Sequence, residues 1–398
     1  MIRYLTAGES HGEALIGIVE GMPAGVPVTP EAINHHLARR WLGYGRGGRS
    51  KFEKDQVHIY SGVRFSKTMG SPIALRIDNA AYTKDRSGWP EIMSVTGTGE
   101  NVDKVTLPRP GHADLAGMQK YGLDDIRPVI DRASARETAM RVACCTIPRL
   151  LLKQFGIEIG SHVVQIGDVG SDDPMDWQDL VAELLPQGAE AINRAADQSE
   201  LRMLDPDLTK RAIEHINETR KKGDSLGGVY EVVVTGVPPG LGSYVQWDRR
   251  LDGRLAQAIM SIQAQKAVEI GDGVRAARQP GSRVHDAITG RNGAFERRSN
   301  RAGGIEGGMS NGMPIIVRGY MKPIPTLIKP LESVDVKSGE SMPTRYERSD
   351  VTSVPAASTV AEATIALVIA NAFLEKYGGD SLNEIRPRFR EDKNVLPG

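Results

Sequence analysis

Short strand-like segments joined by glycine-rich connections are the feature that most constrains the fold of this chain. Runs of β-branched residues, which are typical of strands, occur at residues 2–5, 14–20, 57–63, 71–77, 157–167, 228–237 and 314–320. The 44 glycines follow no Gly-X-Y repeat, so they mark turns and close backbone approaches rather than a collagen-like fold. Strands this close along the chain favour hairpin pairing over a doubly wound parallel sheet. We therefore predict an α+β protein in which antiparallel sheets pack on helices.

Helical segments separate these strands. Thr29 is a good N-cap and Pro30 suits a first helical turn, so a helix is predicted over residues 30–41. A long helix is predicted over residues 134–155, with Ser134 as its N-cap and a kink or break at Pro148. Further helices are predicted over residues 176–196, 206–222, 251–270 and 359–377.

The chain reads as one soluble unit. No Pro- or Ser-rich linker divides it, so residues 1–398 are expected to form a single domain, with a solvated polar tail at about 386–398. The longest apolar stretch, at 363–374, is about a dozen residues, short of the roughly 20 that span a bilayer. The N-terminus lacks the apolar core of a signal peptide. We expect a core helix at 363–374 and no membrane segment.

Composition excludes several functional classes. Lys+Arg and Asp+Glu are equal at 50 each, so no global field points to nucleic acid or a membrane surface. The only two cysteines, Cys144 and Cys145, are adjacent, which excludes a disulfide framework and favours a reduced, cytoplasmic setting. No spacing of His and Cys typical of a metal site occurs, so no metal is expected.

Positive charge is concentrated in a few glycine-bound segments. Between residues 39 and 54, the six cations Arg39, Arg40, Arg46, Arg49, Lys51 and Lys54 are answered only by Glu53. Guanidinium groups and backbone N–H groups in such a turn suit phosphate or carboxylate, although a flexible exposed loop is the alternative. Four further segments have this polar or glycine-rich character, at residues 132–138, 303–312, 322–326 and 348–350. Together they favour a pocket for a polyanionic small molecule.

Two of the eight histidines lie in short polar loops beside glycine. His11 follows Ser10 in the loop at residues 6–12, and His112 lies in the loop at 109–114. Histidine is the usual proton donor near neutral pH, so both are candidates for proton transfer. A plain hydrogen-bonding role is the alternative for each. The other six histidines are interpreted as structural or surface residues.

Three segments, in order along the chain, resemble the signatures of the chorismate synthase family. Residues 8–12 followed by 19–23 resemble the first signature, and residues 134–138 resemble the second. Residues 348–350 with Glu362 resemble the third. The resemblance extends over nearly the whole chain and implies a β-α-β sandwich fold and a homotetramer built as a dimer of dimers. The Cys144–Cys145 pair departs from the small residues expected at that helix position.

The resemblance also implies a reaction in aromatic amino acid biosynthesis. Members of the family are carbon–oxygen lyases of the shikimate pathway that convert 5-enolpyruvylshikimate 3-phosphate to chorismate by 1,4-anti elimination of phosphate. They require reduced FMN although the reaction is redox-neutral, and NADPH is a candidate reductant. By the same resemblance, His11 lies near the leaving phosphate, His112 near the flavin N1–C2=O edge, and Asp350 near flavin N5.

Binding residues are carried over in the same way. The substrate candidates are Ser10, Arg40, Arg46, Arg49, Arg109, Arg136 and Arg348. The FMN candidates are Arg132, Ala133, Ser134, Gln263, Ala264, Gly308, Lys322, Pro323, Ile324, Pro325, Thr326 and Arg348. Arg40 and Arg46 also match positions assigned to NADP in the family.

Two other functions compete with this one. A flavin reductase that only oxidises NADPH would use much of the same pocket. A non-catalytic anion- or RNA-binding protein would use the arginine-rich loops, but the neutral net charge and the low aromatic content of 5% disfavour it.

Overall fold

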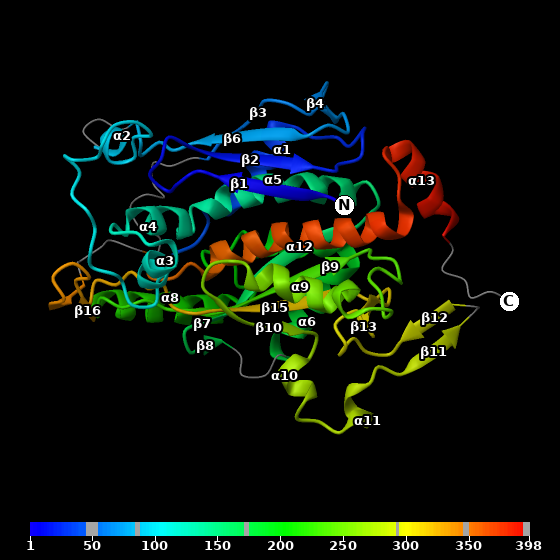
Figure 1. Cartoon of the computed structure of the whole chain (residues 1–398). Helices are drawn as coiled ribbons and strands as arrows, with labels where there is room; N and C mark the ends of the chain where they lie inside the picture. Colours follow the sequence, from blue (N-terminus) through cyan, green and yellow to red (C-terminus); the bar gives the residue numbers. More distant parts are fainter. Residues whose placement is uncertain (45–54, 84–87, 171–174, 292–293, 345–349, 393–398) are drawn as a thin grey trace.

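Two antiparallel sheets enclose a central layer of helices (Figure 1). The computed structural model describes residues 1–44, 55–83, 88–170, 175–291, 294–344 and 350–392. The first sheet has the strand order β1-β2-β6-β3, and the second has the order β10-β15-β9-β7-β8. This arrangement confirms the predicted α+β class and the β-α-β sandwich.

The elements of the sandwich have the following bounds. The strands of the first sheet are β1 Arg3–Ala7, β2 Ala14–Glu20, β6 Ile73–Asp78 and β3 Val57–Ile59. Those of the second are β10 Gln265–Ile270, β15 Ile315–Met321, β9 Gly228–Thr235, β7 Glu158–Ile166 and β8 Val169–Gly170. The longer helices are α1 Pro30–Arg39, α5 Glu137–Lys153, α6 Met175–Leu184, α7 Ala189–Ala196, α8 Pro206–Lys221, α9 Leu251–Met260, α12 Val354–Tyr377 and α13 Leu382–Glu391.

Shorter elements border the sandwich. The short helices are α2 Trp89–Ile92, α3 Asp114–Tyr121, α4 Arg127–Ala133, η2 Leu185–Gln187, η3 Trp247–Arg249, α10 Gly273–Ala276 and α11 Gly281–Val284. The small hairpins are β4 Val63–Arg64 with β5 Lys67–Thr68, β11 Ile288–Arg291 with β12 Ala294–Arg297, β13 Ile305–Glu306 with β14 Met309–Ser310, and β16 Glu332–Val334 with β17 Ser341–Pro343.

The helices α5 and α12 form the middle of the sandwich. They pack against each other, α5 beneath the first sheet and α12 on the second (Figure 1). By length and hydropathy α12 could cross a membrane, but 83% of its most apolar window is buried inside the fold. It is therefore a core helix, as the sequence predicted, and is longer than predicted.

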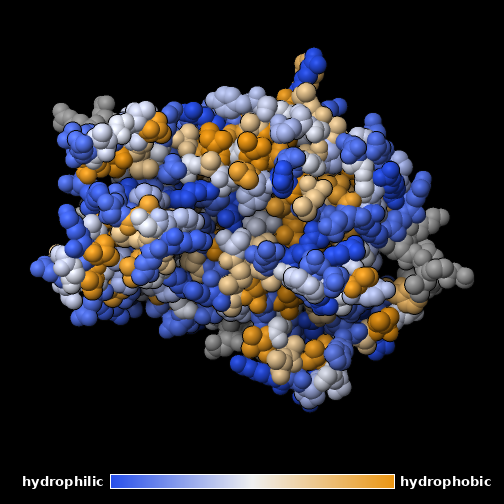
Figure 2. Space-filling model, viewed as in Figure 1, coloured by the Kyte–Doolittle hydropathy of each residue, from blue (hydrophilic) through white to orange (hydrophobic). Residues whose placement is uncertain are grey.

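The first sheet has one face packed on α5 and one face open. Along β2, Leu15 and Val19 point inward and are buried, while Ile16 and Ile18 point outward. Leu5 of β1 lies on the same open face and is 72% exposed. Apolar patches are visible over this sheet in Figure 2. Open apolar faces of this kind are typical of interaction surfaces.

Close packing of α5 on this sheet requires a glycine and small sulfur-containing neighbours. A Cβ added to Gly17 of β2 would lie 2.5 Å from Cys144 Sγ and 2.5 Å from Met140 Sδ. Cys144 and Cys145 are buried here, and the departure from the family pattern is therefore a packing feature.

Several predicted element boundaries were wrong. The helix α5 is not broken at Pro148, because packing on α12 and the first sheet outweighs a cost of about 3 kcal/mol for an interior proline, and the alternative, a kink, stays a prediction. The predicted helix at 251–270 is α9 followed by β10, with a turn at Ala264, whose φ is +65°. The predicted helix at 176–196 is divided by a turn at Gly188, whose φ is +84°.

The predicted cap of the long helix also differs from the structure. Ser134 ends α4 instead of capping the long helix, because its backbone is extended and α5 begins only at Glu137. The tail expected to be solvated begins inside α13, and its described residues 386–392 are exposed or half-buried, whereas the buried Leu382 and Ile385 of this helix precede it. The expectation of one domain over the whole chain stays a prediction.

Candidate active site

The predicted site residues gather where the β1–β2 loop, α3, α4 and the start of α5 lie together, at the left-hand end of the molecule in Figure 1. Loops and helix ends supply most of them, which is where ligand-binding groups are usual on a rigid scaffold. Three predicted residues, Arg46, Arg49 and Arg348, lie outside the described residues.

His11 is held on two sides. Its Nδ1 lies 2.5 Å from Oδ1 of Asp131 in α4, and Ser10 N donates to Asp131 O at 3.0 Å. The imidazole stacks on Trp89 of α2 with the ring centroids 3.9 Å apart. The local turn requires Gly8, whose φ is +100° and whose added Cβ would lie 2.3 Å from a backbone oxygen. The loop thus presents a fixed imidazole at the end of the first sheet.

Arg132 ties the end of α4 to β1. Its Nη2 donates to Thr6 O at 2.8 Å and to Thr6 Oγ1 at 3.0 Å, and its Nη1 donates to Gly8 O at 3.2 Å. The side chain remains exposed. Ser134 Oγ accepts from Arg136 N at 3.2 Å. The Arg-Ala-Ser segment therefore lies beside the His11 loop.

Arg40 and Arg136 are buried and share a carboxylate. Nη1 of Arg136 lies 2.5 Å from Asp55 Oδ1, and its Nε donates to Asn79 Oδ1 at 2.9 Å. Arg40 lies 3.6 Å from Asp55 Oδ2 and donates from Nε to Thr138 Oγ1 at 3.0 Å. Both guanidinium groups are therefore fixed by the protein itself at the start of α5.

His112 belongs to a second charged cluster. Its Nδ1 makes a short hydrogen bond to Oδ1 of Asp114, the first residue of α3. Arg109 donates from Nε to Asp114 Oδ2 at 2.9 Å and from Nη2 to Oδ1 at 3.2 Å. Burial acts to raise the pKa of Asp114, but the hydrogen bonds from His112 and Arg109 outweigh it and hold this pKa well below its ordinary value. Asp114 is therefore an ionised acceptor for both side chains.

The Lys-Pro-Ile-Pro-Thr segment at 322–326 lies against the His112 loop. Lys322 Nζ donates to Gly111 O at 2.5 Å, and Arg109 Nη1 donates to Thr326 Oγ1 at 3.4 Å. An added Cβ on Gly111 would lie 3.2 Å from Lys322 Nζ and 3.6 Å from Pro325 Cβ. Glycine at this position therefore keeps the two segments close.

Glu137 connects the two histidine clusters. It accepts from Thr6 Oγ1 at 3.0 Å on the His11 side and from Gln263 Nε2 at 3.3 Å. Ala264 O, next in the chain, accepts from Lys322 N at 3.0 Å. One hydrogen-bonded framework thus runs from the first sheet to the second, and the turn that replaced the predicted helix at 263–264 is part of it.

The same loops bring Asp350 close to this framework. Ser225 Oγ donates to Ile324 O at 2.7 Å, and Leu226 N donates to Val351 O at 2.8 Å. Ser353 Oγ donates to Asp350 Oδ2 at 3.3 Å. Among the described candidate residues, Gly308 lies apart from this framework. Its carbonyl oxygen accepts from Leu251 N at the start of α9, whereas Gln263 follows the end of that helix.

Apart from Asp350, the carboxylates of the site were not predicted from the sequence. Asp114 stands two residues after His112, so the His-x-Asp spacing was a usable signal. Asp131 lies 120 residues from His11 in the chain, and no local pattern connects them. Asp55 and Glu137 likewise became visible only in the fold.

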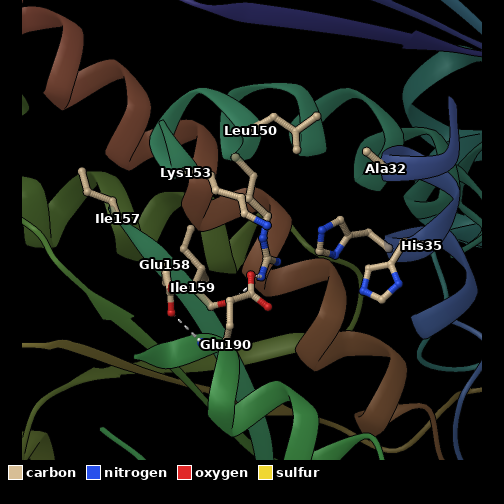
Figure 3. Close-up of a pocket in the computed structure, with 10 residues that line it drawn as sticks. Ala32, His35, Leu150, Lys153, Ile157, Glu158, Ile159 and Glu190 are labelled. Atoms are coloured by element: carbon tan, nitrogen blue, oxygen red, sulfur yellow. Dashed lines mark hydrogen bonds and ion pairs between the residues drawn. The ribbon is translucent and has the colours of Figure 1, made fainter. Parts of the chain in front are cut away.

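A cavity of about 150 Å³ lies elsewhere, between α1, α5 and β7 (Figure 3). Its lining residues are Ala32, His35, His36, Arg149, Leu150, Lys153, Ile157, Glu158, Ile159 and Glu190. None of the predicted catalytic or binding residues lines it. Burial and the nearby Arg149 and Arg39 hold the pKa of His36 well below its ordinary value, so this imidazole is neutral. We do not assign the reaction to this cavity.

Glu362, from the third signature, is buried next to that cavity. It accepts from Arg39 Nη1 at 2.8 Å, from Arg149 Nη1 at 2.6 Å and from Ser161 Oγ at 2.5 Å. Arg202 Nη2 lies 3.3 Å from its Oε1. Burial acts to raise the pKa of Glu362, but Arg39 and Arg149 hold it well below its ordinary value. Glu362 therefore joins α12 to α1, α5 and β7 as a structural ion.

The fold and this site define an α+β sandwich protein with two histidine–carboxylate pairs set among arginines. Comparison with known proteins gives the particular family. A sequence model described as "Chorismate synthase" matches residues 2–374. The chorismate synthase of Salinibacter ruber is 67% identical over 399 residues, covering 99% of each chain, and that of Pelodictyon phaeoclathratiforme is 56% identical, covering 98% of this chain and 96% of its own.

A solved structure supports the same grouping. A crystal structure of chorismate synthase is 44% identical, with a TM-score of 0.78, and the match covers 99% of this chain and 97% of the other. The chain belongs to the chorismate synthase family. The family resemblance inferred from the three signatures is thereby confirmed, and the protein is an enzyme.

Proposed function

We propose that this enzyme is a lyase that converts 5-enolpyruvylshikimate 3-phosphate to chorismate by 1,4-anti elimination of phosphate, with reduced FMN as its cofactor. Family membership supports the lyase class and a place in the shikimate pathway. The observation that carries the proposal is the hydrogen-bond network that links β1, which leads into the His11 loop, through Glu137, Gln263 and Ala264 to Lys322, which bonds the His112 loop at Gly111.

The substrate carries a phosphate and two carboxylates, which guanidinium groups bind well. Arg109, Arg136 and Arg40 are held in fixed positions on both sides of the framework. His11 would donate a proton from its imidazole to the leaving phosphate oxygen. Negative charge builds on that oxygen as the C–O bond breaks, so a proton there lowers the barrier.

The residues present fit a flavin. Oε1 of Gln263 is buried and has no hydrogen-bond partner among the described residues, so an acceptor remains for a ligand N–H. Arg132 is exposed at the end of α4, where a phosphate or flavin edge could meet it. The group would be held by the Arg132–Ser134 segment, Gln263 with Ala264, and the segment 322–326. Bound there, reduced FMN would supply the electron that assists C–O cleavage and take it back when the ring hydrogen leaves.

Two other side chains would handle protons beside that cofactor. His112 would hold a proton near the flavin N1–C2=O edge, with its Nδ1 turned to Asp114. Asp350 would accept the proton from N5, and Ser353 orients its carboxylate. Arg40 would serve NADPH as well, if the chain reduces its own flavin.

We further propose a cytoplasmic homotetramer that binds neither nucleic acid nor membrane. The open face of the first sheet supports the assembly, because Leu5 is 72% exposed and Ile18 is 45% exposed there. Phe295 on the β11–β12 hairpin is 62% exposed and offers a second apolar contact. Light scattering after gel filtration should give four times 43.2 kDa, and a monomer mass would contradict the assembly.

An anaerobic assay tests the reaction. The enzyme is mixed with photoreduced FMN and 5-enolpyruvylshikimate 3-phosphate, and chorismate and phosphate are followed together. Equimolar products that require reduced flavin would support the proposal. Absence of product from protein that still binds FMN would contradict it. NADPH oxidation without product would then indicate a flavin reductase.

A further inference from the structure

Both candidate catalytic histidines contact a buried carboxylate through the same ring nitrogen. Nδ1 of His11 faces Asp131 Oδ1 at 2.5 Å, and Nδ1 of His112 faces Asp114 Oδ1. The side chains of both aspartates are 0% exposed. An ionised carboxylate can only accept, so Nδ1 of His11 carries a proton. His112 Nδ1 lies between Asp114 and Arg109 Nη2, the latter at 3.1 Å, and its shorter contact, the one to Asp114, places a proton on this nitrogen too. Nε2 is then the nitrogen that can exchange a proton with a ligand.

The His11 ring is fixed in orientation as well as in tautomer. Trp89 stacks on it at 3.9 Å with an angle of 19° between the planes. The guanidinium carbon Cζ of Arg127 lies over the Trp89 ring, 5.4 Å from its centroid. Nη1 of the same arginine lies 3.9 Å from Asp131 Oδ2. One arginine thus borders both groups that hold the imidazole.

The two aspartates differ in how many side chains donate hydrogen bonds to them. Asp131 Oδ2 has no hydrogen-bond partner in the part of the chain that the structure describes, so His11 is the only side chain bonded to this carboxylate there. Asp114 accepts from Arg109 through both oxygens as well as from His112. A change at Asp131 therefore acts on one histidine, whereas a change at Asp114 also releases an arginine.

We propose that Asp131 and Asp114 are positioning residues that act through His11 and His112. Each fixes its imidazole with Nδ1–H toward the carboxylate and Nε2 toward the reacting ligand. Neither aspartate touches the substrate in this scheme. The effect on turnover depends on the proposed function, but the fixed tautomer does not.

Asp131→Asn is the sharpest test, because it keeps the shape of the side chain. Arg127 lies near Oδ2 and favours the amide oxygen there, which turns the amide NH₂ toward His11 Nδ1. The amide can then bond only an unprotonated Nδ1, so the neutral ring should switch to the Nε2–H tautomer. We expect kcat to fall by a factor on the order of 10² to 10⁴, the usual contribution of a positioned acid or base, with a smaller change in KM.

A structural readout separates positioning from general damage. ¹⁵N-histidine NMR at a pH of about 9, above the ordinary histidine pKa, should show a protonated Nδ1 for His11 in the wild-type enzyme and an unprotonated Nδ1 in Asp131→Asn. The ¹⁵N signal that disappears in the His11→Gln variant is the one that belongs to His11. An unprotonated Nδ1 in the wild-type enzyme would overturn the proposal even if the enzyme makes chorismate.

Kinetic controls complete the test. Asp124→Asn changes an exposed aspartate seven residues away, paired only with Lys104 among described contacts, and should leave kcat unchanged. In a His11→Ala background, Asp131→Asn should cause almost no further loss, because it acts through that ring. Additive losses, or Asp131→Asn with wild-type kcat and an unchanged tautomer, would refute the positioning role. If unfolding shows that Asp131→Asn is misfolded, the Nδ1 state of His112 in Asp114→Asn gives the tautomer readout, whereas kcat of that variant also reflects the release of Arg109.

Discussion

Replacing Glu362 by Gln should destabilise the fold strongly. This side chain is fully buried and is the shared acceptor of Arg39, Arg149 and Arg202. Gln keeps the size but removes the negative charge, so three guanidinium groups lose their common counter-ion. Removing one partner of a buried ion pair costs about 3–5 kcal/mol. We expect the free energy of unfolding to fall by about that amount.

Urea unfolding at fixed protein concentration, followed by far-UV circular dichroism, measures the effect. The matched control is Glu375→Gln on the same helix, α12. Glu375 pairs with Arg254 at 2.9 Å and its side chain is 40% exposed, so its loss should cost about 0–1 kcal/mol. Equal destabilisation by the two variants would refute the view that the buried cluster holds the helices together.

The cost of Glu362→Gln should depend on pH in a defined direction. The pKa of Glu362 in the folded protein is well below the ordinary value of 4.5. Its stabilising contribution is therefore complete above about pH 4.5 and is lost as pH falls through the lower, folded pKa. The difference between wild type and variant should be constant near neutral pH and shrink on acidification. A difference that grows toward low pH would contradict this assignment.

Three smaller predictions concern packing, thiols and the cofactor. Gly17→Ala should lower the free energy of unfolding by about 1–3 kcal/mol in urea titrations, because its Cβ would lie 2.5 Å from Cys144 Sγ and Met140 Sδ. Cys144 and Cys145 should react with Ellman's reagent only after denaturation. Burial raises the pKa of both thiols, that of Cys145 to about 12. Rapid labelling of the native enzyme would contradict this prediction. Arg132→Ala should weaken FMN binding about 10- to 100-fold in fluorescence titrations, the loss expected for a charged hydrogen bond, and an unchanged Kd would remove Arg132 from the cofactor site.

The sequence predicted elements better than the turns between them. The β-branched residues of β2 were enough to give residues 14–20, the bounds seen in the structure. The predicted helix at 251–270 failed because its apolar residues suit a buried helix and a buried strand equally well. The turn depends on Ala264 at φ +65°, a conformation that alanine rarely adopts and that no local residue signals.

The candidate site was predictable in its residue types but not in its contacts. Glycine-bound loops pointed to His11 and His112, and the fold places both beside arginines. The carboxylates that hold them could not be inferred in the same way, because Asp131 and His11 meet only when α4 packs on the β1–β2 loop. Pairs of residues far apart in the chain cannot be recognised from the sequence, but they can be inferred from burial in the fold. An aspartate with no exposed side-chain surface needs a hydrogen-bond donor beside it.

Burial also separates two kinds of residue within the basic segment at residues 39–54. Arg39 and Arg40 are neighbours at the end of α1, yet Arg39 contacts Glu362 in the core while Arg40 donates to Thr138 at the start of α5. From the sequence, both arginines belonged to the same positively charged segment at residues 39–54. In the fold, the ion cluster around Glu362 anchors the end of α1, and that anchor fixes where Arg40 lies. A substitution in the core cluster should therefore reduce both stability and binding at the site, although the two clusters share no side chain.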